Sequence, residues 1–347
     1  YENASKIYRY VIREYAGISN QLLARLGLIR TREVRVRKSF PVNTDSVKTL
    51  IDDYKRFIEK YPDNGNSLEA TRSEALLFAN YLDQRDSAIS ILNKLITNPR
   101  ASLYLKSKAK LDLGDIYLIK GEPWESTLLY SQVEKTQKEN PVGYEAKLKN
   151  AKLSYYKGDF RLAQEHLDIL KEATTREIAN DAMELSMRIK ENIAFDSVGE
   201  ALKQYASVEL LLYQNKQAEA LEKLKNLKQG QVVIQGNSGQ VVAFSNRTIL
   251  DDVYWLEANM RMKRGEFDEA INLLQRIMTE YPDDILTDDA YFLQGEIYER
   301  QLKKTDKAME IYREFLNKYP GSVYAAEARK RYRTLRGDFN SESTISN

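Results

Sequence analysis

One pattern of apolar and polar positions recurs along the chain. Apolar and small residues repeat three and four positions apart before a short polar segment, as at Tyr254, Ala258 and Met262. They repeat again after it, as at Ala270 and Leu274. This spacing places side chains on one face of a helix. Each occurrence therefore predicts two helices, here called helix A and helix B, joined by a tight turn.

The last residue of the polar segment is usually small and marks the phase of each occurrence. In the hexamer GEFDEA this residue is Ala270, and equivalent hexamers end at five other markers: Ala88, Ser126, Ala163, Ala220 and Ala308. In chain order the six markers are 38, 37, 57, 50 and 38 residues apart, and Leu50 lies a further 38 residues before Ala88. Recurrence at a nearly constant period predicts a repeat architecture rather than one central core.

Small residues twelve positions before three markers predict how helix A packs on helix B. The pairs are Gly114 with Ser126, Ala151 with Ala163, and Ala258 with Ala270. Two helices approach to about 8–10 Å only where the side chains at their crossing are short. We therefore expect each pair to form a crossing point, where a larger side chain would force the hairpin apart.

These residues resemble the tetratricopeptide repeat (TPR) family. LGDIY at 113–117 matches the family's L-G-x-x-Y motif, and Ala308, Tyr312 and Pro320 match its A-x-x-x-F…P motif. The resemblance implies an all-α fold, an α-solenoid in which helical hairpins stack into a right-handed superhelix with the A helices lining its concave face. The spacing of 38 differs from the 34 residues of the usual repeat, and two intervals are much longer.

The start of the sequence fits the middle of a repeat. Tyr1 and Ala4 match Phe267 and Ala270, so residues 1–30 are interpreted as a partial first repeat. We therefore expect upstream residues, where a signal peptide or a lipid anchor could lie.

The composition of the remaining segments, and their position relative to the markers, predict the rest of the domain organisation. The Arg-rich stretch 31–45 is interpreted as a basic linker, with a basic docking patch and an Arg-rich helix end as alternatives. Residues 46–337 are predicted as the solenoid, and residues 338–347 as a disordered polar tail.

The two long intervals predict departures from the regular array. The interval 164–219 is interpreted as a long or doubled helix A, broken near FDSVG at 195–199. The interval that follows contains an insertion at 229–246, where two β-branched runs flank Gly-Asn-Ser-Gly and predict a small β-hairpin. Such an excursion is either a binding element or a neutral insertion.

The amino-acid composition excludes several kinds of catalytic and metal-binding site. The 53 basic and 51 acidic residues nearly cancel, so no global field favours nucleic acid or a membrane surface as the partner. The chain has no Cys and a single His, His166, which excludes thiolate catalysis and multi-His metal sites. No phosphate-binding loop, dinucleotide fingerprint or nucleophile elbow is present, and no apolar run reaches the ~20 residues of a membrane helix. We expect no cofactor, no metal and no catalysis.

Three acidic pairs could suggest a metal or a two-carboxylate catalyst: Asp251-Asp252, Asp283-Asp284 and Asp288-Asp289. Each lies at or just before a predicted helix start, where carboxylates accept hydrogen bonds from free backbone N–H groups and favour the helix dipole. We interpret all three pairs as helix caps.

The TPR resemblance also implies which positions of helix A line the concave groove: three before, one after and four after the small residue. Carried onto this chain these positions are Leu111, Asp115, Leu118, Leu148, Lys152, Tyr155, Trp255, Asn259, Met262, Phe292, Glu296 and Glu299. Trp255 is the first candidate anchor, because a groove Trp supplies a large contact area. The alternative is a core Trp at a helix–helix contact.

The expected function is the binding of other proteins, through an extended segment or a partner helix. The C-terminal repeats, with YPDD and DDAYFLQGEIY, resemble those of bacterial envelope TPR proteins, such as the lipoprotein of the outer-membrane β-barrel assembly machine and the coordinator of the Tol-Pal system. That resemblance implies a periplasmic scaffold, anchored to the outer membrane. The alternatives are a cytoplasmic peptide-binding recruitment module and the interaction region of an enzyme whose catalytic domain lies upstream.

Overall fold

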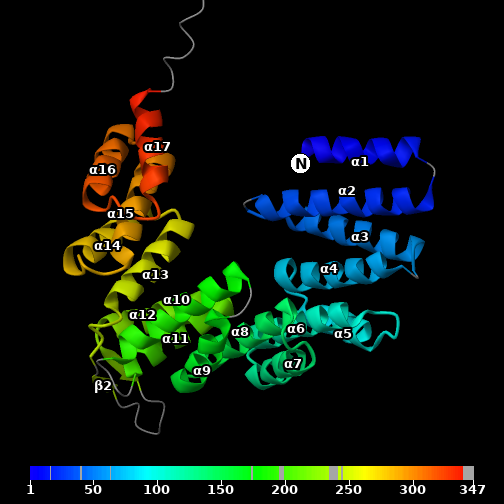
Figure 1. Cartoon of the computed structure of the whole chain (residues 1–347), viewed down its shortest axis with the longest axis horizontal. Coiled ribbons are helices and arrows are strands. Elements are labelled where there is room, and N and C mark those ends of the chain that lie inside the picture. The colour runs from blue at the N-terminus through cyan, green and yellow to red at the C-terminus, as the bar shows by residue number, and fades with distance from the viewer. Residues whose placement is uncertain are drawn as a thin grey trace, which may run out of the picture. The chain divides into compact units, whose positions relative to one another are not determined.

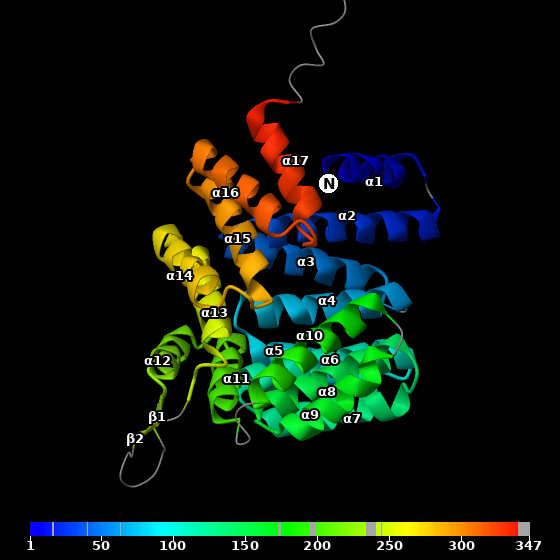
Figure 2. The same ribbon diagram turned by 60° about the vertical axis from the view of Figure 1, so that its left-hand side comes forward.

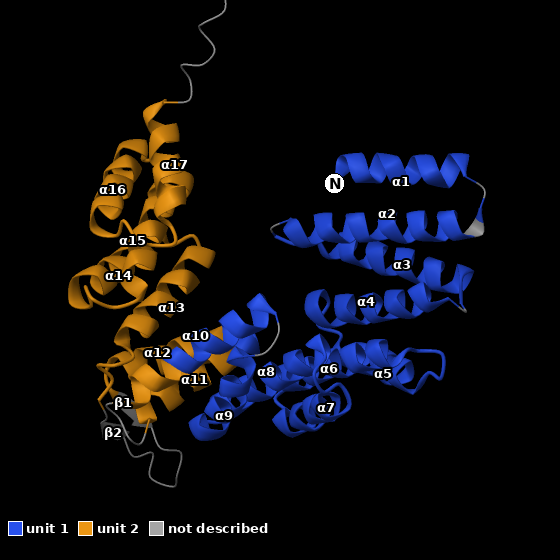
Figure 3. Cartoon of the chain, viewed as in Figure 1, with its two compact units in different colours: residues 1–187, 213–215 blue, residues 188–212, 216–347 orange. Residues whose placement is uncertain are grey.

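The computed structural model describes residues 1–15, 17–39, 41–62, 64–172, 175–194, 199–233, 241–243 and 245–338. Most of these residues lie in helices, which confirms the predicted all-α class. The chain divides into two compact units (Figure 3). Unit 1 comprises Tyr1–Met187 and Tyr213–Asn215, and unit 2 comprises Arg188–Leu212 and Lys216–Asn347. No helix in the described ranges is both long and apolar enough to cross a membrane.

Unit 1 is a stack of antiparallel helices in which each helix from α1 to α8 packs on the next along the chain (Figure 1). Its helices are α1 (Glu2–Glu14), α2 (Ile18–Lys38), α3 (Thr44–Lys60), α4 (Gly65–Tyr81), α5 (Arg85–Thr97), α6 (Leu103–Lys120), α7 (Pro123–Thr136), α8 (Pro141–Tyr156), α9 (Phe160–Lys171) and the first part of α10 (Arg176–Ile193). The A helices of unit 1 are α2, α4, α6, α8 and α10, and its B helices are α1, α3, α5, α7 and α9.

Unit 2 begins within α10, at Arg188, and is also built mainly of helices. It contains α11 (Glu200–Tyr213), α12 (Gln217–Lys228), strands β1 (Gln231–Val233) and β2 (Val241–Ala243), α13 (Leu250–Lys263), α14 (Phe267–Glu280), α15 (Leu286–Glu296), the π-helical turn η1 (Ile297–Gln301), α16 (Thr305–Lys318) and α17 (Ala325–Arg336). The strands pair antiparallel, with Val232 opposite Val242, where the insertion predicts a hairpin. The Gly-Asn-Ser-Gly segment between them lies outside the described residues.

The six turns between helix A and helix B share one conformation. Each contains a residue with a φ between 54° and 86°, always five positions before the marker: Asp83, Gly121, Gly158, Asn215, Gly265 and Lys303. Glycine adopts this left-handed region without strain, and Asp and Asn tolerate it better than most residues. The common position confirms that the six hexamers are equivalent turns.

Small residues bring the paired helices together as predicted. Gly114, Ala151 and Ala258 are buried on the A helices, and Ser126, Ala163 and Ala270 on the paired B helices have no exposed surface. The Ser126 hydroxyl donates to the carbonyl oxygen of Gly114 at 2.8 Å. A Cβ atom added at Gly114 would lie 2.4 Å from the ring of Tyr130, so no larger residue fits there.

The prediction of a linker at 31–45 is wrong for residues 31–38, which form the C-terminal part of α2. Leu22, Leu26, Ile29 and Val36 are buried at helical spacing and pack on α3. Arg32 pairs with Asp53 of α3. The alternating Arg and Val residues look like a polar segment in the sequence, but the alternative of an Arg-rich helix end is confirmed.

The long interval 164–219 contains two helices, α10 and α11, on either side of the predicted break. Residues 195–198 of that break lie outside the described residues, as do residues 339–347 of the predicted tail. Residues 194 and 199 flank the boundary between the two helices, which confirms a doubled helix A rather than one long helix.

Candidate functional site

A groove with a volume of about 940 Å³ lies on the A helices of unit 1. We call it the helix-A groove, and its walls come from α6, α8, the start of α10, and Tyr213. Helices α6 and α8 lie side by side in both views of the molecule (Figures 1 and 2). Four residues that the TPR resemblance assigns to a groove line it together: Asp115, Leu118, Leu148 and Lys152.

Tyrosines supply most of the aromatic surface of the helix-A groove. Tyr104 on α6 is 54 % exposed, and Tyr156 and Tyr213 pack against each other with ring centroids 6.4 Å apart. Tyr130 lies beneath them and is buried. A tyrosine offers a large apolar face together with a polar tip, which suits contacts with both apolar side chains and peptide groups.

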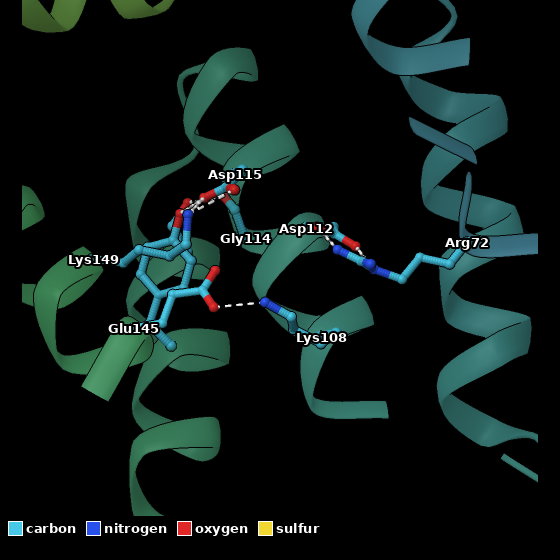
Figure 4. A network of polar contacts seen from close by, with 9 residues as sticks. Arg72, Lys108, Asp112, Gly114, Asp115, Glu145 and Lys149 are labelled. Atoms are coloured by element: carbon cyan, nitrogen blue, oxygen red, sulfur yellow. Dashed lines mark hydrogen bonds and ion pairs between the residues drawn. The ribbon is translucent and has the colours of Figure 1, made fainter. Parts of the chain in front are cut away.

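Ion pairs fix the spacing of the A helices that carry the groove (Figure 4). Lys108 and Lys149 bind Glu145 and Asp115 across α6 and α8, at 2.7 and 2.8 Å. Further pairs join α8 to α10 and α4 to α6, the first between Lys152 and Asp181 at 3.2 Å and the second between Arg72 and Asp112. Each pair links neighbouring A helices, so the polar lining of the groove is ordered before any partner binds.

Asp115 also anchors a buried tyrosine that the sequence did not single out. The Tyr130 hydroxyl donates to Asp115 at 2.7 Å. Burial, and then the charge of Asp115, raise the pKa of Tyr130 well above its ordinary value, so the phenol remains a donor. The same arrangement occurs between Tyr54 and Glu33 at 2.5 Å and between Tyr312 and Glu299 at 2.6 Å. Tyr130 and Tyr312 stand four positions after a marker, and Tyr54 stands four positions after Leu50, so the repeat phase is the signal that finds all three.

The remaining predicted groove residues differ in accessibility. Leu111 and Tyr155 in unit 1 and Phe292 in unit 2 are buried, and Leu118 and Leu148 expose little surface. The residue one position after the small residue is partly exposed in all four repeats: Asp115, Lys152, Asn259 and Glu296. These four positions therefore offer more surface to a partner than the apolar positions do.

In unit 2 the predicted groove residues are already engaged within the unit. Trp255 and Met262 are half-buried against the core cluster, and the Asn259 side chain donates to the Trp255 carbonyl at 2.9 Å. Glu296 and Glu299 both bind Arg331 of α17, at 2.8 and 3.2 Å. Trp255 therefore contacts the core with part of its side chain and leaves the rest accessible.

The helix-cap interpretation of the acidic pairs is only partly confirmed. The Asp284 carboxylate accepts a hydrogen bond from the Leu286 backbone N–H at 2.8 Å. Asp251 and Asp252 lie in the first turn of α13, but both are buried, and Asp252 binds Arg188 at 3.1 Å. Burial, and then the charges of Asp252 and Asp284, raise the pKa of Asp251 to about 8. His166 is half-buried on α9, and burial lowers its pKa.

The raised pKa of Asp251 predicts a loss of stability in mild alkali. An unfolded Asp has a pKa near 3.9, so folding favours the protonated form. The stability that this form contributes is complete below pH ~4 and is lost as the pH rises through about 8. We expect Asp251→Asn to raise the melting temperature by roughly 5 °C at pH 9 and to change it little at pH 5. Thermal unfolding followed by circular dichroism at both pH values measures this.

The matched control is Asp306→Asn, because Asp306 also lies in a first turn but is exposed. Its melting temperature should follow that of the unaltered chain at both pH values. Equal shifts for Asp251→Asn at pH 5 and pH 9 would contradict the assignment of a titrating buried carboxyl.

Comparison with known proteins adds a family match in unit 2. The tetratricopeptide repeat model matches residues 252–284 and 289–322, which correspond to the hairpins α13–α14 and α15–α16. These two hairpins are TPR-type repeats, as their motifs predict. No curated protein matches the sequence.

Two solved structures show weak likeness to the chain. An IFIT1 monomeric mutant with Gppp-AAAA has 12% sequence identity and a TM-score of 0.35, with 96% of this chain and 67% of that chain covered. The TPR domain of P58(IPK) has 16% identity and a TM-score of 0.28, with 92% and 90% covered.

Proposed function

We propose that this chain is a non-catalytic scaffold for protein–protein interaction, and that the helix-A groove of unit 1 binds an extended segment of a partner protein. The observation that carries the proposal is the groove itself: about 940 Å³, lined by accessible tyrosines and by ion pairs that join consecutive A helices. The TPR-type repeats of unit 2 support a role in protein interaction.

The paired charges favour an extended, mixed-polarity segment over a strongly charged one. Each groove lysine named above already faces a carboxylate, so the lining offers alternating donors and acceptors instead of one sign of charge. Because the lining is ordered in advance, binding costs little conformational entropy on the scaffold side. The tyrosines then supply the apolar contact area for one or two anchoring side chains.

Replacing Tyr104 tests the groove directly. A displayed library of ten-residue peptides is selected on the full chain, and the best binders are measured by fluorescence anisotropy. We expect Tyr104→Ala to weaken their binding about tenfold, because Tyr104 is the most exposed aromatic residue of the groove. Tyr10→Ala is the control, since Tyr10 is 52 % exposed on α1, outside the groove. Equal effects of both substitutions, or no effect of Tyr104→Ala, would refute this site.

We further propose that the scaffold serves as an adaptor in a bacterial envelope complex, in the periplasm and held at the outer membrane. The support is the resemblance of the C-terminal repeats to envelope TPR proteins. Fractionation of the native host, followed by cross-linking and mass spectrometry, tests the location. Recovery from the cytoplasm, or covalent continuity with an upstream catalytic domain, would favour the alternative roles.

A further inference from the structure

A second groove lies on the B helices of unit 1 and shares no lining residue with the helix-A groove. We call it the helix-B groove: α7 and α9 form its walls, α8 forms its floor, and its volume is about 990 Å³. Both wall helices pack antiparallel on α8, so they run in the same direction. Their first residues therefore mark one end of the groove and their last residues the other.

Exposed apolar side chains stand along both walls of the helix-B groove. Trp124 at the start of α7 is 78 % exposed, and Leu162 and Ile169 on α9 are 39 % and 53 % exposed. Trp is seldom left this open on a surface without a partner, because its ring is the largest apolar side chain. Trp124 and Leu162 mark the first end, and Ile169 lies toward the other end, so apolar anchor points occur near both.

The helix-B groove is lined by four lysines and three carboxylates, and only one of those lysines, Lys147, forms a salt bridge within the described residues. The central carboxylate of the groove, Glu134, is already bound by Lys147 at 2.6 Å and by Asn150 at 2.9 Å. Within the described part of the chain, Lys135 and Lys138 form no salt bridge. Lys157 lies over the Trp124 ring at 4.6 Å instead of facing a carboxylate. Cations without an acidic partner thus stand at both ends of the groove.

We propose that the helix-B groove binds an acidic amphipathic helix of a partner protein. From Trp124 to its end at Thr136 the α7 wall spans about 18 Å, and Lys138 lies two residues beyond it, so the groove matches a helix of roughly 12 to 14 residues. Apolar residues on one face of that helix contact Trp124 and Ile169, and its acidic residues reach Lys135, Lys138 and Lys157. Glu134, Glu139 and Asp159 also line the groove and disfavour the continuous phosphate charge of a nucleic acid.

The test uses two displayed libraries of 14-residue amphipathic helices that differ only in carrying Glu or Lys on the polar face. Both are selected on the full chain. We expect the acidic library alone to yield binders, and Trp124→Ala to weaken the best of them about tenfold. Lys135→Glu combined with Lys138→Glu should weaken binding to a similar extent and remove its salt dependence. Tyr104→Ala, in the other groove, should leave it unchanged.

A second readout reports on the groove directly. Trp255→Phe leaves Trp124 as the sole tryptophan of the chain, and its fluorescence emission should move to shorter wavelength when the selected peptide covers it. Trp124→Ala should keep the circular dichroism spectrum of the unaltered chain, because the side chain is largely exposed.

Three results would overturn the proposal. The first is binding of the basic library or of a single-stranded oligonucleotide in preference to the acidic library. The second is an acidic binder whose affinity is insensitive to Trp124→Ala. The third is concentration-dependent self-association that Trp124→Ala abolishes, which would assign the groove to a second copy of this chain.

Discussion

Replacing Arg331 with Ala is expected to lower the free energy of unfolding of unit 2 by about 3 kcal/mol and to release α17 from the last hairpin. The Arg331 guanidinium binds Glu296 at 2.8 Å, Glu299 at 3.2 Å and Glu327 at 2.9 Å. Its side chain is only 10 % exposed and also lies over the Phe292 ring. Removal leaves two partly buried carboxylates without their cation, which costs more than the loss of an exposed ion pair.

Hydrogen exchange of the α17 amides and urea unfolding measure the two effects of Arg331→Ala. We expect the α17 amides to lose most of their protection while those of α13 keep theirs. Arg329→Ala is the matched control, because Arg329 lies two residues away on the same helix and is exposed. If both variants lose protection equally, the helix depends on the charge of its surface and not on the Arg331 network.

Introducing Val at Gly114 is expected to cost about 3 kcal/mol and to disturb the helix-A groove. Even the first added carbon would lie 2.4 Å from the Tyr130 ring. The ring has little freedom to yield, because Tyr130 is buried and its hydroxyl is held by Asp115. Since Asp115 also binds Lys149, displacement of the ring would alter the polar lining of the groove. Urea unfolding and the peptide affinity of the groove should both decrease.

Gly65→Ala is the control for Gly114→Val, because a Cβ atom at Gly65 meets nothing within 4 Å. It should be neutral or stabilise by a few tenths of a kcal/mol, as expected for a glycine in a helical conformation. A double variant, Gly114→Val with Tyr130→Leu, should be less destabilised than the sum of the two single variants. Additive losses would show that the ring is not the obstacle.

The sequence predicted the hairpins because their packing depends on a few residues at fixed spacing. Gly114 meets Ser126 as expected, Ala258 and Ala270 are buried in one core cluster, and the hexamers are the turns. Glycine occupies the left-handed position in only some of these turns. Asp83 and Lys303 adopt the same left-handed conformation, although nothing in their residue type requires it. Their place follows only from the phase of the markers.

Other features could not be predicted because they depend on tertiary contacts. The Arg and Val residues at 32–37 did not predict a helix from the sequence. The ion pair between Arg32 and Asp53 forms only when α2 packs on α3, so it could not be foreseen. The division into two units within the interval 164–219 has no local motif of its own.

The candidate site was predictable at some positions and not at others. The position after the small residue, as at Asp115 and Lys152, is determined by helix geometry and reaches the surface. The apolar positions, as at Leu111 and Tyr155, are buried by the neighbouring helices. The carboxylate partner of each buried tyrosine stands at a different sequence distance, 15 residues for Asp115 and 13 for Glu299. No fixed spacing could have identified these pairs.

The left-handed residue five positions before each marker makes the hairpins interchangeable as cassettes. A chain cut at that residue in one hairpin and joined to the same residue of another would keep the reversal geometry at the junction. Duplication or deletion of a whole hairpin would then change the length of the protein, and exchange would change its surface, while the turn conformation at the junction stays the same. Recombination at these residues would therefore be tolerated, and each exchanged hairpin would bring its own surface residues to the new position.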